Sequence, residues 1–149
     1  MPGDEGIVYA LSVSDRRGDR KRNVRLALFT AGFGIEGDAH AGTGRPVSLL
    51  PFESFAKLDP SGGGLRPGDF AENITTSGID FSLVRVGSLI RVGGKVVLEV
   101  VQIGKECHEN CEIRRTAGDC IMPREGAFAR VVNGGVVRPG DPVVIMDER

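Results

Sequence analysis

The sequence predicts a mainly β fold, either a barrel or a sandwich. Short runs of β-branched and other apolar residues follow one another along the chain, and glycine-rich turns separate most of them; the chain has 22 glycines among 149 residues. Short strands at such regular spacing are typical of sandwiches and barrels. No regular alternation of strands with helices is evident, which argues against a parallel α/β sheet.

The N-terminal half contains two strand candidates separated by a charged loop, namely "GIVYALSV" (6–13) and "NVRLALFT" (23–30). The stretch "AGFGIEGDAHAGTG" (31–44) holds too many glycines for a regular element and predicts a long, shaped loop. A short strand is expected at 47–50. Pro51 suits the first turn of a short helix that ends near Leu58.

The C-terminal half contains the clearest local signal, in which two β-rich runs flank Gly93-Gly94. Paired glycines accept the positive φ angles of a two-residue turn, so "SLIRVGGKVVLEVVQI" predicts a β-hairpin. The segment "REGAFARVV" can form a helix or a strand, and its Ala and Arg residues favour the helix. The remaining expectations are a strand at 73–75, one helical turn in "IDFSLV" (79–84), and a second hairpin-like pair in "VVRPGDPVVIM" (136–146) around the turn 139–141.

Composition indicates a single domain that spans residues 1–149. Hydrophobic residues make up 40% and charged residues 26% of the chain, as in soluble globular proteins. The net charge of −1 gives no general electrostatic case for nucleic acid. No targeting signal and no apolar stretch of about 20 residues is visible, so we expect a cytoplasmic protein that is not membrane-bound. The basic run "SDRRGDRKR" (14–22) is either a solvated loop or an anion-attracting rim.

All three cysteines lie in one segment, "GKECHENCEIRRTAGDC" (104–120), together with one of the two histidines. Zinc is one interpretation, because Cys107, His108, Cys111 and Cys120 offer the soft ligands that a tetrahedral ion binds. Closed zinc sites usually present two paired ligand motifs, whereas Cys120 stands alone and the adjacent Cys107 and His108 would be strained around one ion.

A nucleophilic thiol is the second interpretation of this segment. Cys107 follows a strong strand directly, which is where a rigid scaffold positions a loop residue. Lys105 and His108 are cations that lower the pKa of a nearby thiol, although neighbouring glutamates oppose them. Cys111, four residues further on, can act as a resolving partner or sulfur relay. For Cys120, burial as a small apolar residue is an equal alternative.

The other histidine, His40, lies in "GDAHAG". It is either an exposed loop residue or, with Asp38 and Arg45 nearby in sequence, part of a polar pocket. A Cys–His pair of His40 with Cys107 is compatible with the sequence but is not determined by it.

Several segments taken together resemble the MOSC family, the domain named for the C-terminal part of molybdenum-cofactor sulfurases. They are "GIEGDAHAG", "RPVSLL", "GDFAENITTSGIDFSLVRVGSLIRVGGKVVLEVVQIGKECHENC" and "MPREGAFARVVNGGVVRPGD", and the resemblance extends from about Gly6 to Ile145. It is closest to small stand-alone bacterial members. The family implies a MOSC-type β-barrel with a few short helices, and a role in handling sulfur or the molybdenum cofactor.

In this family one cysteine near a strand end is thought to carry persulfide sulfur or to ligate molybdenum. Other members have Gln-Pro-Arg-x-Pro-Cys here, and Gln102 precedes Cys107 by the same offset. The resemblance therefore assigns the family cysteine to Cys107. Gly104 and Glu106 replace the family Arg and Pro, and Cys111 is an alternative equivalent because "CEI" also resembles the residues that follow the family cysteine.

The resemblance implies a sulfur-carrier or molybdenum-cofactor-binding domain, with sulfurtransferase-like activity that does not depend on pyridoxal phosphate. Its partner would be a cysteine desulfurase or a molybdenum-cofactor biosynthesis enzyme. Cys107, Cys111 and His108 are the candidate catalytic residues. The alternatives are a non-catalytic partner module of a cofactor-synthesis enzyme and a zinc-stabilised structural domain. Candidate cofactor-binding residues, which could offer cations or hydrogen bonds to a persulfide or a pterin phosphate, are Asp38, His40, Arg45, Asn73, Thr75 and Lys105.

Overall fold

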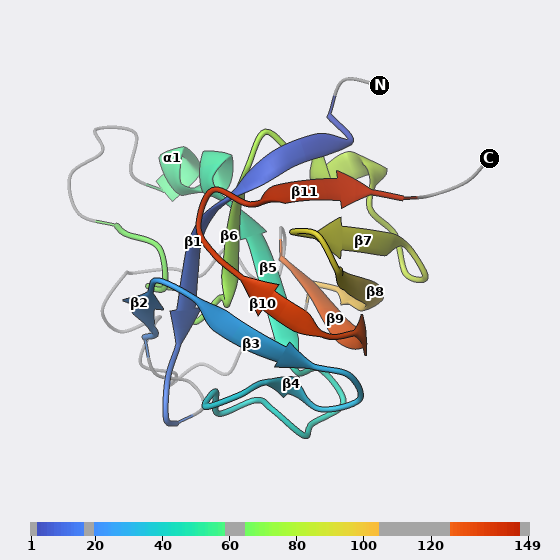
Figure 1. Cartoon of the computed structure of the whole chain (residues 1–149). Coiled ribbons are helices and arrows are strands. Elements are labelled where there is room, and N and C mark those ends of the chain that lie inside the picture. The colour runs from blue at the N-terminus through green and yellow to red at the C-terminus, as the bar shows by residue number, and fades with distance from the viewer. Residues whose placement is uncertain (1–2, 17–19, 59–64, 105–125, 147–149) are drawn as a thin grey trace.

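A closed β-barrel forms the body of the protein (Figure 1). The computed structural model describes residues 3–16, 20–58, 65–104 and 126–146. The predicted β-barrel is therefore confirmed, and it is mixed because one neighbouring pair of strands is parallel. Around the barrel the strands follow the order β11 (Pro142–Ile145), β7 (Leu89–Val92), β8 (Val96–Ile103), β9 (Ala127–Asn133), β5 (Val47–Pro51), β6 (Ile74–Ser77) and β1 (Glu5–Val13), which pairs with β11 again.

A second, three-stranded sheet has the order β10 (Gly135–Val137), β3 (Ala27–Thr30) and β4 (Gly34–Ile35). The single strand predicted at 23–30 is wrong, because the chain changes sheets within it. Its first part belongs to β2 (Arg22–Val24), which pairs with β1, and a bend at Arg25 then leads into β3. The predicted loop 31–44 also contains β4, since the chain turns back to pair with β3.

The second predicted hairpin, at 136–146, is also wrong. Its two arms are β10 and β11, but β10 pairs with β3 whereas β11 pairs with β1 and β7. The turn at 139–141 therefore connects two sheets. The favoured helix in "REGAFARVV" is likewise replaced by a strand, β9, because it is hydrogen-bonded between β8 and β5 and this pairing overrides local propensity.

The predicted hairpin of β7 and β8 is confirmed, with a longer turn than expected. Val92 pairs with Val96, so three residues rather than two form the connection, and Gly93 has a φ of 69° that favours glycine. Inside β8, buried and half-buried residues alternate up to Val101, as expected for a strand with one face in the core.

In the described residues, two helical segments interrupt the strands. The chain leaves β5 through a 3₁₀ turn, η1 (Phe52–Ser54), and one short helix, α1 (Phe55–Leu58), and later returns as β6, parallel to β5. The predicted short helix that ends near Leu58 is therefore confirmed, whereas the parallel pairing of the two strands that flank it was not predicted. The predicted turn in "IDFSLV" is η2 (Phe81–Leu83). In the described part of the chain, no helix is both long and apolar enough to span a membrane.

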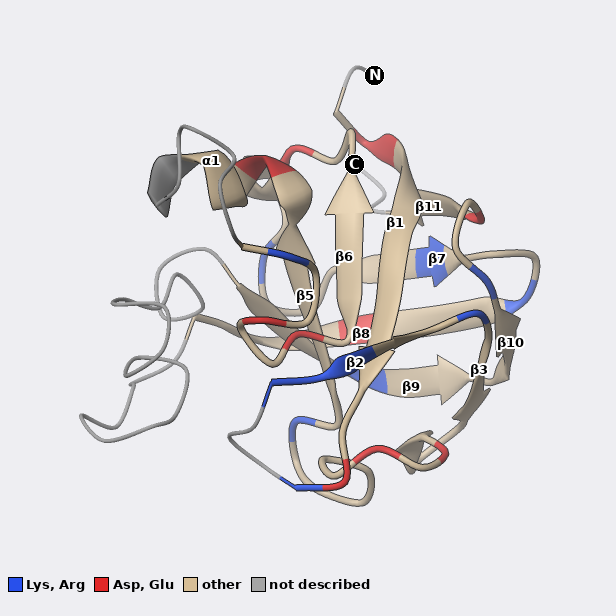
Figure 2. Ribbon diagram, turned by 90° about the vertical axis from the view of Figure 1, so that its left-hand side faces the viewer, with Lys and Arg blue, Asp and Glu red and all other residues tan. Residues whose placement is uncertain are grey.

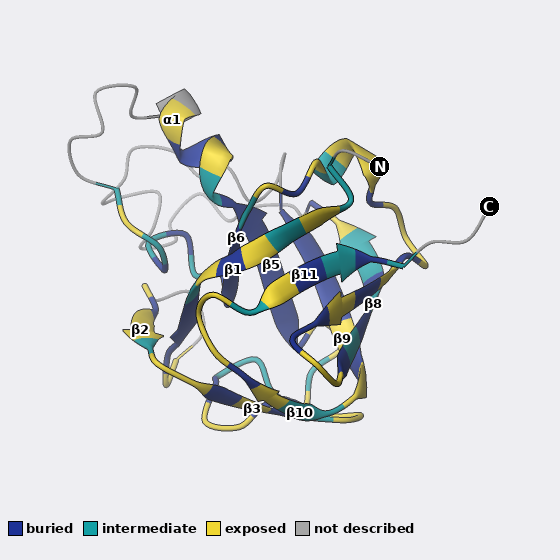
Figure 3. Ribbon diagram, turned by 45° about the horizontal axis from the view of Figure 1, so that its top comes forward, coloured by how far each residue is buried: buried dark blue, intermediate teal, exposed yellow. Residues whose placement is uncertain are grey.

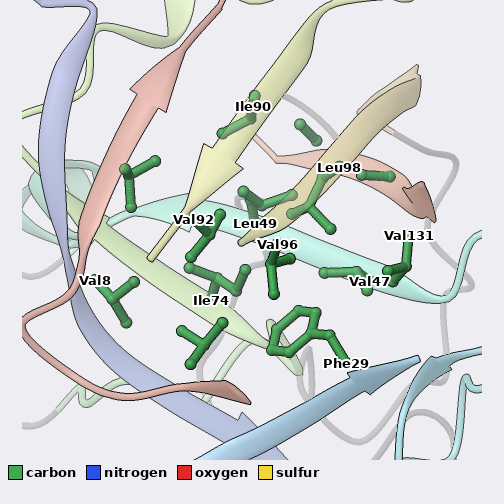
Figure 4. Packing of buried hydrophobic residues seen from close by; sticks show 14 of the residues in the cluster. Val8, Phe29, Val47, Leu49, Ile74, Ile90, Val92, Val96, Leu98 and Val131 are labelled. Carbon is green, nitrogen blue, oxygen red and sulfur yellow. The ribbon is translucent and has the colours of Figure 1, made fainter. Parts of the chain in front are cut away.

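Apolar side chains from all sides of the barrel meet in its interior (Figure 4). Buried residues accordingly concentrate on the inward faces of the strands, while β1 and β11 alternate between buried and exposed positions (Figure 3). Strand β5 is buried on both faces: Val47 and Leu49 belong to the interior cluster, whereas Leu50 belongs to a second cluster with Phe55, Phe70 and Phe128. Strand β5 therefore contributes side chains to both apolar clusters.

The turn before β6 packs tightly against the start of β2, and glycine is required there. Gly68 has a φ of 96°, and a Cβ built on it would lie 2.3 Å from the carbonyl oxygen of Lys21. We expect Gly68→Ala to lower the free energy of unfolding by roughly 2–4 kcal/mol, because a clash with backbone adds to the cost of the left-handed conformation. Chemical denaturation measures this.

Gly87 is the matched control, because it has the same φ of 96° and its Cβ would meet nothing within 4 Å. Gly87→Ala is expected to lower the free energy of unfolding by only about 1–2 kcal/mol. Equal losses in the two variants would contradict the tight packing of Gly68.

Candidate functional site

The described residues on either side of the cysteine segment lie next to each other. The Gly104 amide donates a hydrogen bond of 2.7 Å to the Gly126 carbonyl, and the Gln102 Nε2 donates one of 2.7 Å to the Gly104 carbonyl. The two ends of the segment are therefore joined where β8 ends and β9 begins. The predicted catalytic residues Cys107, His108 and Cys111, together with Lys105 and Cys120, lie outside the described residues, and their roles stay predictions.

Arg45 contacts both β8 and β9 near this junction. Its Nη1 donates a hydrogen bond of 3.2 Å to the Gln102 Oε1, and its guanidinium carbon lies 5.2 Å from the centre of the Phe128 ring, at cation–π distance. The Arg45 residue is exposed. The structure thus places Arg45, a predicted cofactor-binding cation, beside Gln102, which precedes Cys107 by five positions.

His40 and Arg45 belong to one compact turn before β5. The Thr43 hydroxyl donates to the His40 carbonyl at 2.7 Å and accepts from the Arg45 amide at 3.2 Å. The His40 side chain is 27% exposed. The predicted loop therefore holds a partly accessible imidazole and an accessible guanidinium within a few residues of each other.

The Asp38 side chain is fully buried and contacts the His40 amide. Its Oδ1 accepts hydrogen bonds from the Lys21 ammonium at 2.8 Å and the Ser14 amide at 3.1 Å, and its Oδ2 accepts one from the His40 amide at 3.0 Å. Burial alone would raise the pKa of the Asp38 carboxyl, but hydrogen bonds from the His40 amide and from Lys21, together with the charge of Lys21, lower that pKa well below its usual range. Asp38 is therefore an ionised anchor for the loop.

Lys21 is the functional candidate that sequence reasoning missed. Its side chain is fully buried, and its Nζ donates to the Asp38 Oδ1 at 2.8 Å and the Ser14 Oγ at 3.1 Å and lies 3.3 Å from the His40 Nδ1. Basic residues run along β2 and the stretch that leads into it (Figure 2). Nothing in the run "SDRRGDRKR" distinguishes the one buried lysine from its exposed neighbours, because burial depends on the distant Asp38.

Asn73 and Thr75 are placed differently from the other predicted binding residues. Both are fully buried. The Asn73 Oδ1 accepts from the Ser48 amide at 3.0 Å, and its Nδ2 donates to the Ser12 carbonyl at 3.0 Å. The Thr75 hydroxyl donates to the Glu72 Oε2 at 2.8 Å. Asn73 thus connects its segment to β5 and β1, whereas Thr75 bonds locally to Glu72, and the role of both as cofactor-binding residues stays a prediction.

Glu72 is a fully buried carboxyl group beneath the turn before β6. It accepts hydrogen bonds from the Gly68 amide at 2.8 Å and the Phe70 amide at 3.2 Å, besides that from Thr75. Burial raises the pKa of Glu72 above its ordinary value, although these hydrogen bonds oppose the shift. Gly68 in turn accepts from the Lys21 amide at 2.9 Å, so Glu72 supports the backbone that carries Lys21.

The arrangement suits an anion better than a bare metal ion. Arg45 offers an accessible planar guanidinium, which is the preferred partner of phosphate and carboxylate groups, and His40 offers a partly accessible ring. Over the described ranges, no group of three His, Cys, Asp or Glu side chains is arranged to hold a metal.

Comparison with known proteins identifies the family of this chain. The family model for the MOSC domain matches residues 36–144. The chain belongs to the MOSC family. The match includes the His40–Arg45 turn and the whole cysteine segment, as the resemblance of the sequence predicted. No curated protein matches the chain.

Several solved structures share the fold. The YuaD protein from Bacillus subtilis superposes with a TM-score of 0.79 at 18% identity, over 97% of each chain. YiiM from Geobacillus stearothermophilus has a TM-score of 0.73 at 20% identity, over 95% of this chain and 75% of that one. YiiM from Escherichia coli has a TM-score of 0.65 at 20% identity, over 100% and 71%. At these identities the likeness concerns the fold alone.

The buried ion pair of Lys21 with Asp38 gives the first prediction of this site. Lys21→Met leaves the Asp38 carboxylate buried without its counter-charge, and we expect it to lower the free energy of unfolding by about 3–5 kcal/mol. Arg22→Met is the control, because the Arg22 guanidinium is exposed and lies 3.8 Å from an exposed Asp15; its effect should stay within about 0.5 kcal/mol. Equal effects in urea denaturation would contradict the buried pair.

The raised pKa of Glu72 predicts a pH dependence. The folded protein retains the Glu72 proton to a higher pH than the unfolded chain does, so this group destabilises the fold increasingly as pH rises above its ordinary value of 4.5. Glu72→Gln does not titrate. The free energy of unfolding of wild type minus that of Glu72→Gln should therefore fall with rising pH, by at most about 1.4 kcal/mol per pH unit. A level or rising difference would contradict the shift.

Proposed function

We propose that this MOSC domain carries sulfur, or binds the molybdenum cofactor, in molybdenum-cofactor metabolism, with Cys107 as the reactive thiol. Membership of the MOSC family gives the general link to this cofactor. The observation that supports the specific role most is the contact of Arg45 with Gln102, five positions before Cys107. A permanent cation thus lies at the base of the segment that carries every cysteine.

The chemistry proposed for Cys107 is sulfur transfer from a persulfide. A cysteine thiol becomes nucleophilic as a thiolate, and nearby cations lower its pKa from about 8.5. The Cys107 thiolate attacks the outer sulfur of a donor persulfide, so that a new S–S bond forms on Cys107 while the donor S–S bond breaks and the donor cysteine leaves as a thiolate. The exchange needs no external oxidant. A cysteine desulfurase is the proposed donor, and Cys111 is the proposed relay or rival thiol.

The residues of the His40–Arg45 turn fit the anionic part of the molybdenum cofactor. The Arg45 guanidinium would hold a phosphate group by charge-assisted hydrogen bonds, and His40 would donate a further one. Asp38 would act through His40, since its own oxygens are occupied by Lys21, Ser14 and the His40 amide. When bound, the cofactor would supply a redox-active molybdenum centre that a cysteine thiolate can ligate.

Sulfur labelling tests the proposal. The protein is incubated with a cysteine desulfurase and cysteine labelled in its sulfur, and label that reducing agents release is counted. Wild type is expected to take up label and Cys107→Ser to lose it, whereas Cys120→Ser, the matched control in the same segment, should retain it. Intact mass spectrometry should find added sulfur in the same variants.

Other outcomes would replace the proposal. Undiminished labelling of Cys107→Ser would overturn the site, and would favour Cys111 if Cys111→Ser loses the label instead. A wild type that takes up no label and binds no molybdenum cofactor would favour a non-catalytic partner of a cofactor-synthesis enzyme. Stoichiometric zinc that Cys111→Ala loses would favour a zinc-stabilised domain.

A further inference from the structure

His40 is held by a buried ammonium group, and this arrangement determines which of its ring nitrogens can carry a proton. We infer that Lys21 is a positioning residue that fixes the neutral His40 ring as the Nε2–H tautomer, so that the site presents a hydrogen-bond donor to its ligand. Sequence reasoning assigned neither a role to Lys21 nor a protonation state to His40.

The Lys21 side chain can donate hydrogen bonds but cannot accept one. A lysine ammonium has three N–H donors and no acceptor. Three acceptors lie within reach of the buried Nζ, namely the Asp38 Oδ1 at 2.8 Å, the Ser14 Oγ at 3.1 Å and the His40 Nδ1 at 3.3 Å. Each N–H therefore has one partner, provided that the His40 Nδ1 carries a lone pair.

The opposite tautomer, with the proton on the His40 Nδ1, is disfavoured. That proton would face the ammonium hydrogens and would leave one buried, charged Lys21 donor without an acceptor, which is unfavourable. It would not gain Asp38 in exchange, because the Asp38 Oδ2 lies 3.7 Å from Nδ1, beyond hydrogen-bond distance, and already accepts from the His40 amide.

The other hydrogen bonds around Lys21 are consistent with the Nε2–H tautomer of His40. Ser14 can accept from Lys21 because its own hydroxyl proton is donated to the Arg16 carbonyl at 3.0 Å. The backbone of Lys21 is fixed by the bond from its amide to Gly68. Every donor in the cluster thus has a partner, and the ammonium cannot turn away from His40 without losing one.

The outer edge of the ring is the part left for a ligand. The Nδ1 edge faces the fully buried Lys21 side chain, and the His40 side chain as a whole is 27% exposed. Among the residues that the structure describes, the His40 Nε2 has no hydrogen-bond partner. An Nε2–H in this place would select a hydrogen-bond acceptor, such as an oxyanion or a sulfur anion. That choice of ligand rests on the proposed function, whereas the tautomer does not.

Nitrogen NMR of the wild-type protein tests the tautomer directly. Long-range ¹H–¹⁵N spectra separate protonated from unprotonated imidazole nitrogens, and the chain has only two histidines, so His40→Gln assigns the signals. At pH about 8, the His40 Nδ1 should resonate as an unprotonated and the Nε2 as a protonated nitrogen. A protonated Nδ1, or averaged shifts from a mixture of tautomers, would overturn the inference.

A variant pair tests the part played by Lys21. Lys21→Met should move the His40 nitrogen shifts toward those of a tautomer mixture, while Arg22→Met, its exposed neighbour, should leave them unchanged. Unchanged shifts in a folded Lys21→Met protein would overturn the role of Lys21. If that variant does not fold, the wild-type spectrum decides alone, since it requires no substitution.

Inorganic thiosulfate is the probe for the ligand class. Its addition to wild type should shift the His40 Nε2 resonance and leave Nδ1 largely unchanged. No response would overturn the proposed ligand class while the tautomer stands. A clear response combined with failed sulfur labelling would instead separate an anion site from the proposed sulfur-carrier function.

Discussion

The structure depends on the pairing of its last strand with its first. Strand β11 lies between β1 and β7 and so closes a sheet that would otherwise end in two open edges. Closure brings side chains from every strand into one interior, where Val8, Leu49, Leu98 and Val143 are all excluded from solvent. Because this pairing joins Glu5 to Val144, closure of the barrel is a contact between segments that are remote in sequence.

A second consequence of the barrel is that it supports the loop that holds the candidate site residues. Strand β5 is buried on both faces, and the turn that holds His40 and Arg45 leads directly into it. Arg45 then reaches Gln102 on β8 and Phe128 on β9, which are neighbouring strands. Below the turn, the pairing of Lys21 with Asp38 connects the start of β2 to the same loop. Side chains from distant parts of the sequence therefore meet on one scaffold.

The sequence predicted the individual strands better than their partners. Alternation and glycine-rich turns suffice for β1, β5 and the β7–β8 hairpin, because these signals are local. The same local signals misled at 23–30 and 136–146, where the chain changes sheets, and in "REGAFARVV", where pairing on both sides outweighs helix propensity. In the candidate site, the glycine-rich loop drew attention to Asp38, His40 and Arg45, and their functional role stays a prediction.

By itself, the sequence determined the fold class, the family and the residue types available for sulfur or anion chemistry, because composition, turn residues and motif order are properties of the chain. Only the tertiary structure decided which polar groups are buried. It made Lys21 a core cation, it engaged Asn73 in a bond to Ser12 of β1, and it left Arg45 accessible. The physical reason is that burial and ion pairing depend on neighbours that are remote in sequence, such as Asp38 for Lys21 and Ser12 for Asn73.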